Sequence, residues 1–380
     1  MSSPNSSPTL SPSFVRALSP TPTVLEPSFF VLPDLVSHCS FSLTYHDDGD
    51  AIAADSLDWI LSFSPHFSQD KVAAMRGLQA GELTAYCYNN CTSPRLRVVS
   101  DFMNYLFHLD DVSDGFLARD AEGLANWVMN AFEWPDDYRP VRGQRGGIQE
   151  NNAAKLAREG SSRGARVSPS FWSRCIRDCA PAVQQRFKSH MQMFFQAVQQ
   201  QALCRADGIV SDLETYIDMR RDTSGCKPVF DLIEYSLDLE LPDAVIEHPV
   251  IAALNQGAND LVTWSNDLFS YNVEQSRGDT HNMVCVFMIH DGLGLQQAVD
   301  RIGEMCKQTI DAFVRNRERV PSWGDRVDED VKLYVNGLQE WIVGSLHWSF
   351  MTTRYFGDNG GLVKATRIVD LVSRECSKAA

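Results

Sequence analysis

Three aspartates extend an apolar helical stripe in the segment LRVVSDFMNYLFHLDDVSDG. From Leu96 to Leu106 the apolar residues of this stripe recur at intervals of three and four, which is typical of one helix face. Steps of four continue the stripe to Asp110 and Asp114, and Asp111 is a neighbour of Asp114. Buried carboxylates need a compensating cation, and oxygen ligands without His or Cys favour Mg²⁺ over zinc. A water-exposed acidic helix end is the alternative for this motif alone.

A second set of oxygen-bearing side chains also continues an apolar helical stripe. Asn266, Ser270 and Glu274 are spaced by four residues and continue an apolar stripe through Ala258 and Val262. Each step of four rises roughly 6 Å along a helix, so the three side chains form one ridge. An amide oxygen, a hydroxyl and a carboxylate can chelate one Mg²⁺, with water or phosphate completing the octahedron. A polar ridge on a surface helix would explain any one of the three residues.

Two basic clusters could bind an anionic group. Arg220 and Arg221 precede a predicted helix break that ends at Gly225, and Arg354 and Tyr355 end an aromatic-rich helix. Guanidinium groups bind phosphate oxygens in a bidentate manner and remain charged when desolvated. Ordinary ion pairs would explain either cluster taken alone.

The elements that must position these residues are predicted to be helices. Apolar residues recur with helical periodicity from about residue 50 to 375, without the alternation of strands. Candidate helices cover roughly 54–64, 70–78, 96–114, 120–132, 170–204, 210–222, 228–238, 248–275, 281–290, 295–317, 328–356 and 361–375. We therefore expect an all-α protein.

The two ends of the chain and one internal segment differ from this pattern. Residues 1–34 are rich in Ser and Pro and are predicted to be a disordered tail. Residues 35–360 would form one domain, followed by a C-terminal helix or tail over 361–380. The Gly-rich and basic segment 139–168 is predicted to be a surface loop, with a basic lid over an anionic substrate as the alternative.

Composition excludes several classes of partner. Among 380 residues, 34 are Lys or Arg and 49 are Asp or Glu, so the net charge of −15 argues against nucleic acid. No stretch of eighteen apolar residues exists, so neither a transmembrane helix nor a membrane partner is expected. The ten cysteines are scattered, which predicts reduced thiols and a cytoplasmic location. No oligomeric state follows from these features.

Taken together and in this order, the motifs resemble those of class I terpene synthases. The family pattern D(D/E/N)xx(D/E) is similar to residues 110–114, and NDxxSxxxE is similar to residues 266–274. Arg220, 46 residues before Asn266, matches the diphosphate-sensing Arg of the family, and Arg354-Tyr355 matches its terminal RY pair. The tract NDLFSYNVEQSRGDTHNMV most resembles fungal sesquiterpene synthases of the basidiomycete type.

The resemblance implies a fold and a set of metal ligands. It implies a single helical bundle around a central apolar cavity, and three Mg²⁺ ions at its mouth. Two ions would be held by Asp110, Asp111 and Asp114, and the third by Asn266, Ser270 and Glu274.

The resemblance also implies contacts with a substrate. Arg220, Arg354 and Tyr355 would grip the diphosphate, and Thr223 and Ser224 resemble the positions that help to trigger ionisation. Phe107 and Trp348 match cavity aromatics, whose faces attract cations, although core packing would explain them equally well. Many relatives have Lys where this chain has Val273, so one diphosphate contact is absent or supplied elsewhere.

The expected activity is Mg²⁺-dependent ionisation of farnesyl diphosphate, with release of diphosphate and formation of a sesquiterpene hydrocarbon or alcohol. An acyclic alcohol synthase of the nerolidol or linalool type, which also uses geranyl diphosphate, is one alternative. A non-catalytic isoprenoid-binding helical protein is another. A chain-elongating prenyltransferase would normally carry two Asp-rich motifs. The second motif here is NDxxSxxxE and is not Asp-rich, which argues against that class.

Overall fold

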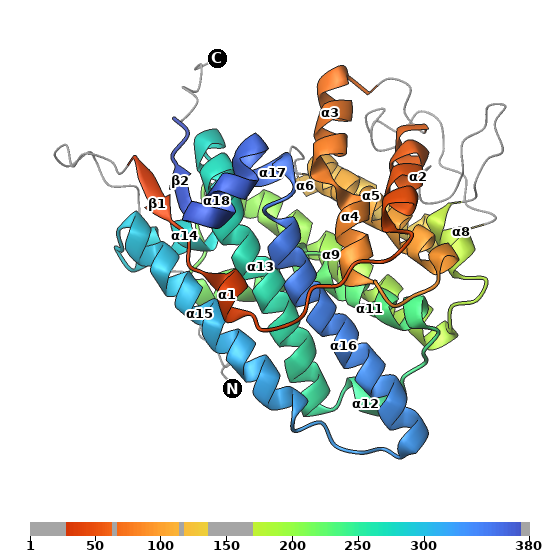
Figure 1. Cartoon of the computed structure of the whole chain (residues 1–380). Coiled ribbons are helices and arrows are strands. Elements are labelled where there is room, and N and C mark those ends of the chain that lie inside the picture. The colour runs from red at the N-terminus through yellow and green to blue at the C-terminus, as the bar shows by residue number, and fades with distance from the viewer. Residues whose placement is uncertain (1–27, 63–66, 114–117, 136–169, 374–380) are drawn as a thin grey trace, which may run out of the picture.

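The computed structural model describes residues 28–62, 67–113, 118–135 and 170–373. Its elements, in chain order, are β1 Phe29–Val31, α1 Leu35–His38, α2 Gly49–Ser62, α3 Gln69–Leu78, α4 Ala80–Cys87, α5 Ser93–Ser113, α6 Ala118–Glu133, α8 Phe171–Cys175, α9 Pro181–Ala206, α10 Leu213–Thr223, α11 Cys226–Leu237, α12 Asp243–Ile246, α13 Pro249–Arg277, α14 Met283–His290, α15 Leu295–Arg317, α16 Asp325–Trp348, α17 Thr353–Phe356, a 3₁₀ turn Gly357–Asn359, α18 Gly360–Thr366 and β2 Ile368–Asp370. The protein is therefore all-α, as the sequence predicts (Figure 1).

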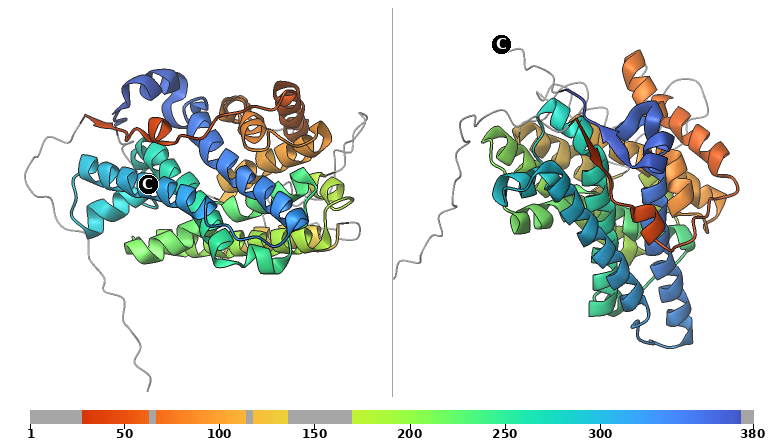
Figure 2. Two further views of the ribbon diagram at one scale, coloured as in Figure 1. Left: turned by 60° about the horizontal axis from the view of Figure 1, so that its bottom comes forward. Right: turned by 60° about the vertical axis from the view of Figure 1, so that its left-hand side comes forward.

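Helix α13 is the central element of the bundle. It packs against α14, α15, α16 and α17, while α5 packs against α2, α4 and α8. Helix α11 contacts both α5 and α13, and Figures 1 and 2 show these helices within one bundle. The two helices that carry the predicted metal ligands thus belong to the same bundle.

The ends of α13 follow from local sequence. Pro249 takes the first helical position, where its missing N–H costs nothing, and His248 caps the helix by accepting a hydrogen bond from the N–H of Val250. Gly278, with φ of 78°, ends the helix in the left-handed conformation that glycine adopts without strain. Between these ends the 29-residue helix buries its apolar stripe.

Most predicted helices are present, with three differences. The expected helix 170–204 is two helices, because Pro181 begins α9 after a turn. The expected helix 328–356 is likewise α16 followed by α17, whose start is capped by Thr352. The short helices α1, α4 and α12 were missed by the sequence analysis.

A small sheet joins the two ends of the described chain. Strand β1 pairs antiparallel with β2 in the register Phe30 to Val369, and both of these residues are buried. Strand β1 lies in the segment that was predicted to be a disordered tail. Helix α18 forms the first part of the helix predicted over 361–375, and β2 stands in place of the part that follows. Two three-residue strands are too short to show alternation, and their pairing spans almost the entire chain. Helix α18 ends where Arg367 adopts a φ of 62°.

Three expectations concern residues that lie partly or wholly outside the described ranges. The tail 1–27, the basic segment 139–168 and Asp114 are among them. Within the described ranges, no helix combines the length and the apolar character that a membrane crossing requires.

Candidate active site

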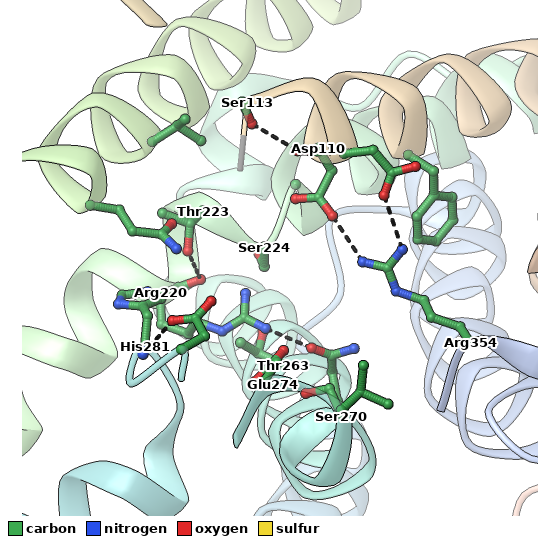
Figure 3. Close-up of a pocket in the computed structure, with 18 of the residues that line it drawn as sticks. Asp110, Ser113, Arg220, Thr223, Ser224, Thr263, Ser270, Glu274, His281 and Arg354 are labelled. Atoms are coloured by element: carbon green, nitrogen blue, oxygen red, sulfur yellow. Dashed lines mark hydrogen bonds and ion pairs between the residues drawn. The ribbon is translucent and has the colours of Figure 1, made fainter. Parts of the chain in front are cut away.

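A cavity of about 970 Å³ opens between α5 and α13. Every predicted site residue within the described ranges lines it: Phe107, Asp110, Asp111, Arg220, Thr223, Ser224, Asn266, Ser270, Glu274, Trp348, Arg354 and Tyr355. Figure 3 shows the carboxylate of Asp110 and the ridge of Ser270 and Glu274 on opposite sides of this space. The structure therefore brings together residues that are far apart in the sequence.

The α5 side of the cavity carries two carboxylates that are paired with cations. Asp110 and Asp111 lie in the last turn of α5, where the helix dipole disfavours negative charge. Arg354 contacts both of them, with Nη2 3.1 Å from Asp110 Oδ2 and Nη1 3.4 Å from Asp111 Oδ1. Lys71 of α3 forms an ion pair with the other oxygen of Asp111. The two acidic residues are thus neutralised by side chains from α3 and α17, and the sequence analysis missed Lys71.

Hydrogen bonds hold the predicted ligand side chains on the α13 side. Asn266 accepts a bond of 2.8 Å from Arg220 through Oδ1 and donates one of 2.7 Å from Nδ2 to the hydroxyl of Tyr355. Glu274 Oε2 accepts a bond of 2.8 Å from Asn282. Desolvation and the nearby charge of Asp267 raise the pKa of Glu274 to about 7.

Ser270 lies between Asn266 and Glu274 on the same ridge. Its hydroxyl oxygen is buried and makes no hydrogen bond of good geometry within the described residues, although it lies close enough to Glu274 to lower the pKa of that carboxyl. An unsatisfied buried hydroxyl is costly and calls for a ligand. The ridge therefore presents a hydroxyl oxygen whose lone pairs can accept a ligand.

Arg220 is fixed from behind by Asp267. Its Nε lies 3.0 Å from Asp267 Oδ1, and Asp267 Oδ2 accepts hydrogen bonds from Tyr216 at 2.5 Å and from the N–H of Met283 at 3.1 Å. Although burial lowers the pKa of Arg220, Asp267 raises it above its ordinary value, so the guanidinium stays charged. Asp267 is the second residue of the NDxxSxxxE motif, but its contact with Arg220 does not follow from the sequence.

The break between α10 and α11 brings two hydroxyls to the cavity wall. Gly225 adopts a φ of 69°, and a Cβ at this position would lie 3.1 Å from Leu106. Ser224 donates a bond of 3.0 Å to Asn259 on α13, and the hydroxyl of Thr223 donates a bond of 3.4 Å to the Arg220 carbonyl. The break is therefore tied to the neighbouring central helix.

Comparison with known proteins identifies this arrangement. The family model for terpene synthase family 2, C-terminal metal binding, matches residues 101–312. An α-muurolene synthase of Coprinopsis cinerea is 56% identical over 347 residues, which cover 91% of this chain and 79% of that protein. The chain belongs to the terpene synthase family. This terpene synthase is also 56% identical over 368 residues to a sesquiterpene synthase of Cyclocybe aegerita, covering 96% of this chain and 99% of the relative.

Solved structures agree on the fold of this terpene synthase. A hedycaryol synthase superposes with a TM-score of 0.69 at 20% identity, covering 84% of this chain and 98% of that chain. An α-eudesmol synthase superposes with a TM-score of 0.68 at 21% identity, covering 82% and 97%. The bundle is therefore the class I terpenoid synthase fold that the motifs predict.

The donor atoms of this terpene synthase fit a hard divalent cation. The two sides offer carboxylate, amide and hydroxyl oxygens, the ligands that Mg²⁺ prefers, and the unpartnered Ser270 hydroxyl faces this set. Among the described residues, no group of three or more His, Cys, Asp or Glu side chains forms a metal site by itself. Within the described residues, a cation would therefore use Asn and Ser oxygens in addition to carboxylates.

The aromatic residues of the cavity are already engaged in contacts. The rings of Phe107 and Trp348 have centroids 5.8 Å apart, and the guanidinium of Arg354 lies 5.6 Å from the Phe107 centroid. The indole N–H of Trp348 donates to the carbonyls of Leu78 and Gln79. Phe107 therefore stabilises Arg354 as well as lining the wall.

Val273 stands where many relatives have Lys, and Arg277 lies close enough along α13 to supply a positive charge instead. Val273 lines the cavity and brings no charge, but Arg277, one helical turn later on α13, also lines it. His281 lies nearby, and burial together with Arg220 lowers the pKa of its imidazole to about 3. The side chain of His281 is therefore neutral.

Proposed function

We propose that this terpene synthase catalyses the Mg²⁺-dependent ionisation of farnesyl diphosphate and forms a sesquiterpene hydrocarbon or alcohol. One observation carries the proposal: the oxygen ligands and the guanidinium groups of Arg220 and Arg354 line one cavity, whose wall also carries apolar and aromatic side chains such as Leu106 and Trp348. The relatives from Coprinopsis cinerea and Cyclocybe aegerita, named as an α-muurolene synthase and a sesquiterpene synthase, support the C15 substrate.

Three ions are part of this proposal. Asp110, Asp111 and Asp114 would hold two of them, and Asn266, Ser270 and Glu274 would hold the third. When bound, the ions supply electrostatic and Lewis-acid stabilisation to the departing diphosphate.

The side chains of the protein have separate tasks in the ionisation. Arg220, kept charged and oriented by Asp267, donates to diphosphate oxygens. Arg354 exchanges its contacts with Asp110 and Asp111 for the diphosphate, and Tyr355 donates its hydroxyl. When the C–O bond breaks, its electron pair stays with the diphosphate oxygen and an allylic cation remains.

The cavity wall protects that cation from water. Trp348 and Phe107 present aromatic rings, each worth on the order of 0.5–2 kcal/mol to a nearby cation. Thr223 and Ser224 line the wall at the break after Arg220 and would help to trigger ionisation. The sequence-based expectation of a cytoplasmic location stays a prediction.

Incubation with defined substrates tests the proposal. The purified protein is given farnesyl or geranyl diphosphate with MgCl₂, diphosphate release is measured, and volatile products are identified by gas chromatography with mass spectrometry. We expect C15 volatiles from farnesyl diphosphate and none in EDTA. Full turnover in EDTA would refute the metal assignment, and an acyclic alcohol from both substrates would favour the nerolidol or linalool type of synthase.

A further inference from the structure

Asn282 lies directly behind the Glu274 side of the cavity. It precedes α14, and its side chain is fully buried. Its Nδ2 donates hydrogen bonds of 2.8 Å to Glu274 Oε2 and to the carbonyl of Asp267, while its Oδ1 caps α14 by accepting 2.8 Å from the N–H of Val284. One amide group therefore contacts two turns of α13 and the first turn of α14.

This arrangement limits the freedom of the Glu274 carboxylate. Glu274 has three rotatable side-chain bonds and lies in the last turn of α13, before Gly278. The bond from Asn282 occupies Oε2, so the plane of the carboxylate is set from behind the cavity. Groups that hydrogen-bond to metal ligands fix the orientation of those ligands and commonly govern affinity for the ion.

We propose that Asn282 is a positioning residue for cation binding, which holds the Glu274 carboxylate so that Oε1 faces the cation. The inference rests on the proposed function, because it concerns the same Mg²⁺ ions. Asn282 itself lines no part of the cavity and would not touch the substrate. Its effect is exerted through the orientation of Glu274.

A second buried asparagine of the same region offers a matched control. Asn272 lies on α13 and is also buried. Its Nδ2 donates 2.9 Å to the carbonyl of Asp370, and its Oδ1 accepts 2.9 Å from the N–H of Val372. These bonds stabilise the contact of α13 with β2 and its flank and do not reach the cavity. Loss of either asparagine therefore removes a buried amide, but only Asn282 contacts Glu274.

The experiment compares Asn282→Ser with Asn272→Ser in the full chain. Serine caps helices about as well as asparagine, so Asn282→Ser retains the cap of α14, while its shorter side chain no longer extends an amide N–H to Glu274. The thermal unfolding midpoint is measured as MgCl₂ is titrated at a fixed concentration of inorganic diphosphate. We expect Asn282→Ser to raise the Mg²⁺ concentration that gives half of the stabilisation by about 10-fold or more, and Asn272→Ser to leave it unchanged.

A double-mutant cycle tests whether the effect passes through Glu274. In the Glu274→Gln background, Asn282→Ser should cause no further change in the Mg²⁺ midpoint. If Asn282→Ser unfolds the protein, Asn282→Asp replaces it, since Asp also caps helices but presents an acceptor to Glu274 Oε2. A folded Asn282 variant with the Mg²⁺ midpoint of the wild type overturns the inference.

Diphosphate release by the wild type, read together with the Mg²⁺ titrations of the variants, distinguishes failure of the proposed function from failure of the role of Asn282. If wild-type protein releases no diphosphate from farnesyl diphosphate in the presence of Mg²⁺, the proposed function fails and the inference falls with it. If the wild type turns over and both serine variants behave alike in the Mg²⁺ titration, only the role of Asn282 is refuted.

Discussion

The two sides of the cavity carry their polar groups in different ways. On the α5 side, the carboxylates of Asp110 and Asp111 are 37% and 33% exposed and are paired with the flexible side chains of Arg354 and Lys71. On the α13 side, Asp267 is 2% exposed, and a network of hydrogen bonds fixes Asn266 and Glu274. The α13 side is thus assembled in the ligand-free protein, whereas the α5 side must exchange its counter-ions when metal and diphosphate bind.

Removing one ligand from each side should give the largest effect. Asp110→Ala and Asn266→Ala should each reduce Mg²⁺-dependent release of diphosphate by on the order of 10²–10³-fold, because stabilisation of the leaving group is lost. Release of diphosphate from farnesyl diphosphate measures this, and circular dichroism should remain helical. Full activity in either variant would contradict the metal assignment.

Replacing Asp267, which anchors Arg220, should have the next largest effect on activity and should also lower the stability of the fold. Asp267→Asn leaves the buried guanidinium without its carboxylate partner, and losing one member of a buried pair costs roughly 3–5 kcal/mol. Urea unfolding measures the free energy of unfolding, and steady-state kinetics should show a lower kcat. Unchanged stability would mean that Arg220 is not held in this way.

The partly exposed ion pair of Lys71 with Asp111 should contribute much less to stability and activity. Lys71→Met removes the ion pair with Asp111, whose members are 26% and 33% exposed, so the free energy of unfolding should change by less than about 1 kcal/mol. If Asp111 binds metal as proposed, Lys71 would compete with the metal for it, and the variant should require no more Mg²⁺ than the wild type. A Mg²⁺ titration of diphosphate release checks this, and a strongly raised requirement would show that Lys71 assists binding instead.

The sequence predicted the ridges of the site better than the contacts behind them. Asn266, Ser270 and Glu274 could be found because helical spacing of four puts residues on one face. Lys71 and Asn282 could not, because their contacts depend on how α3 and α14 pack, and no spacing in the sequence records that. The pairing of β1 with β2 was missed for the same reason. Asp114 lies outside the described residues, and its role stays a prediction.

Helix α17 contacts both walls of the cavity. Its consecutive residues Arg354 and Tyr355 reach in different directions, the first to Asp110 on α5 and the second to Asn266 on α13. A single peptide bond therefore connects the opposite walls of the cavity. The contacts to both walls thus depend on one four-residue helix, so a change in the backbone of α17 would alter both of them at once.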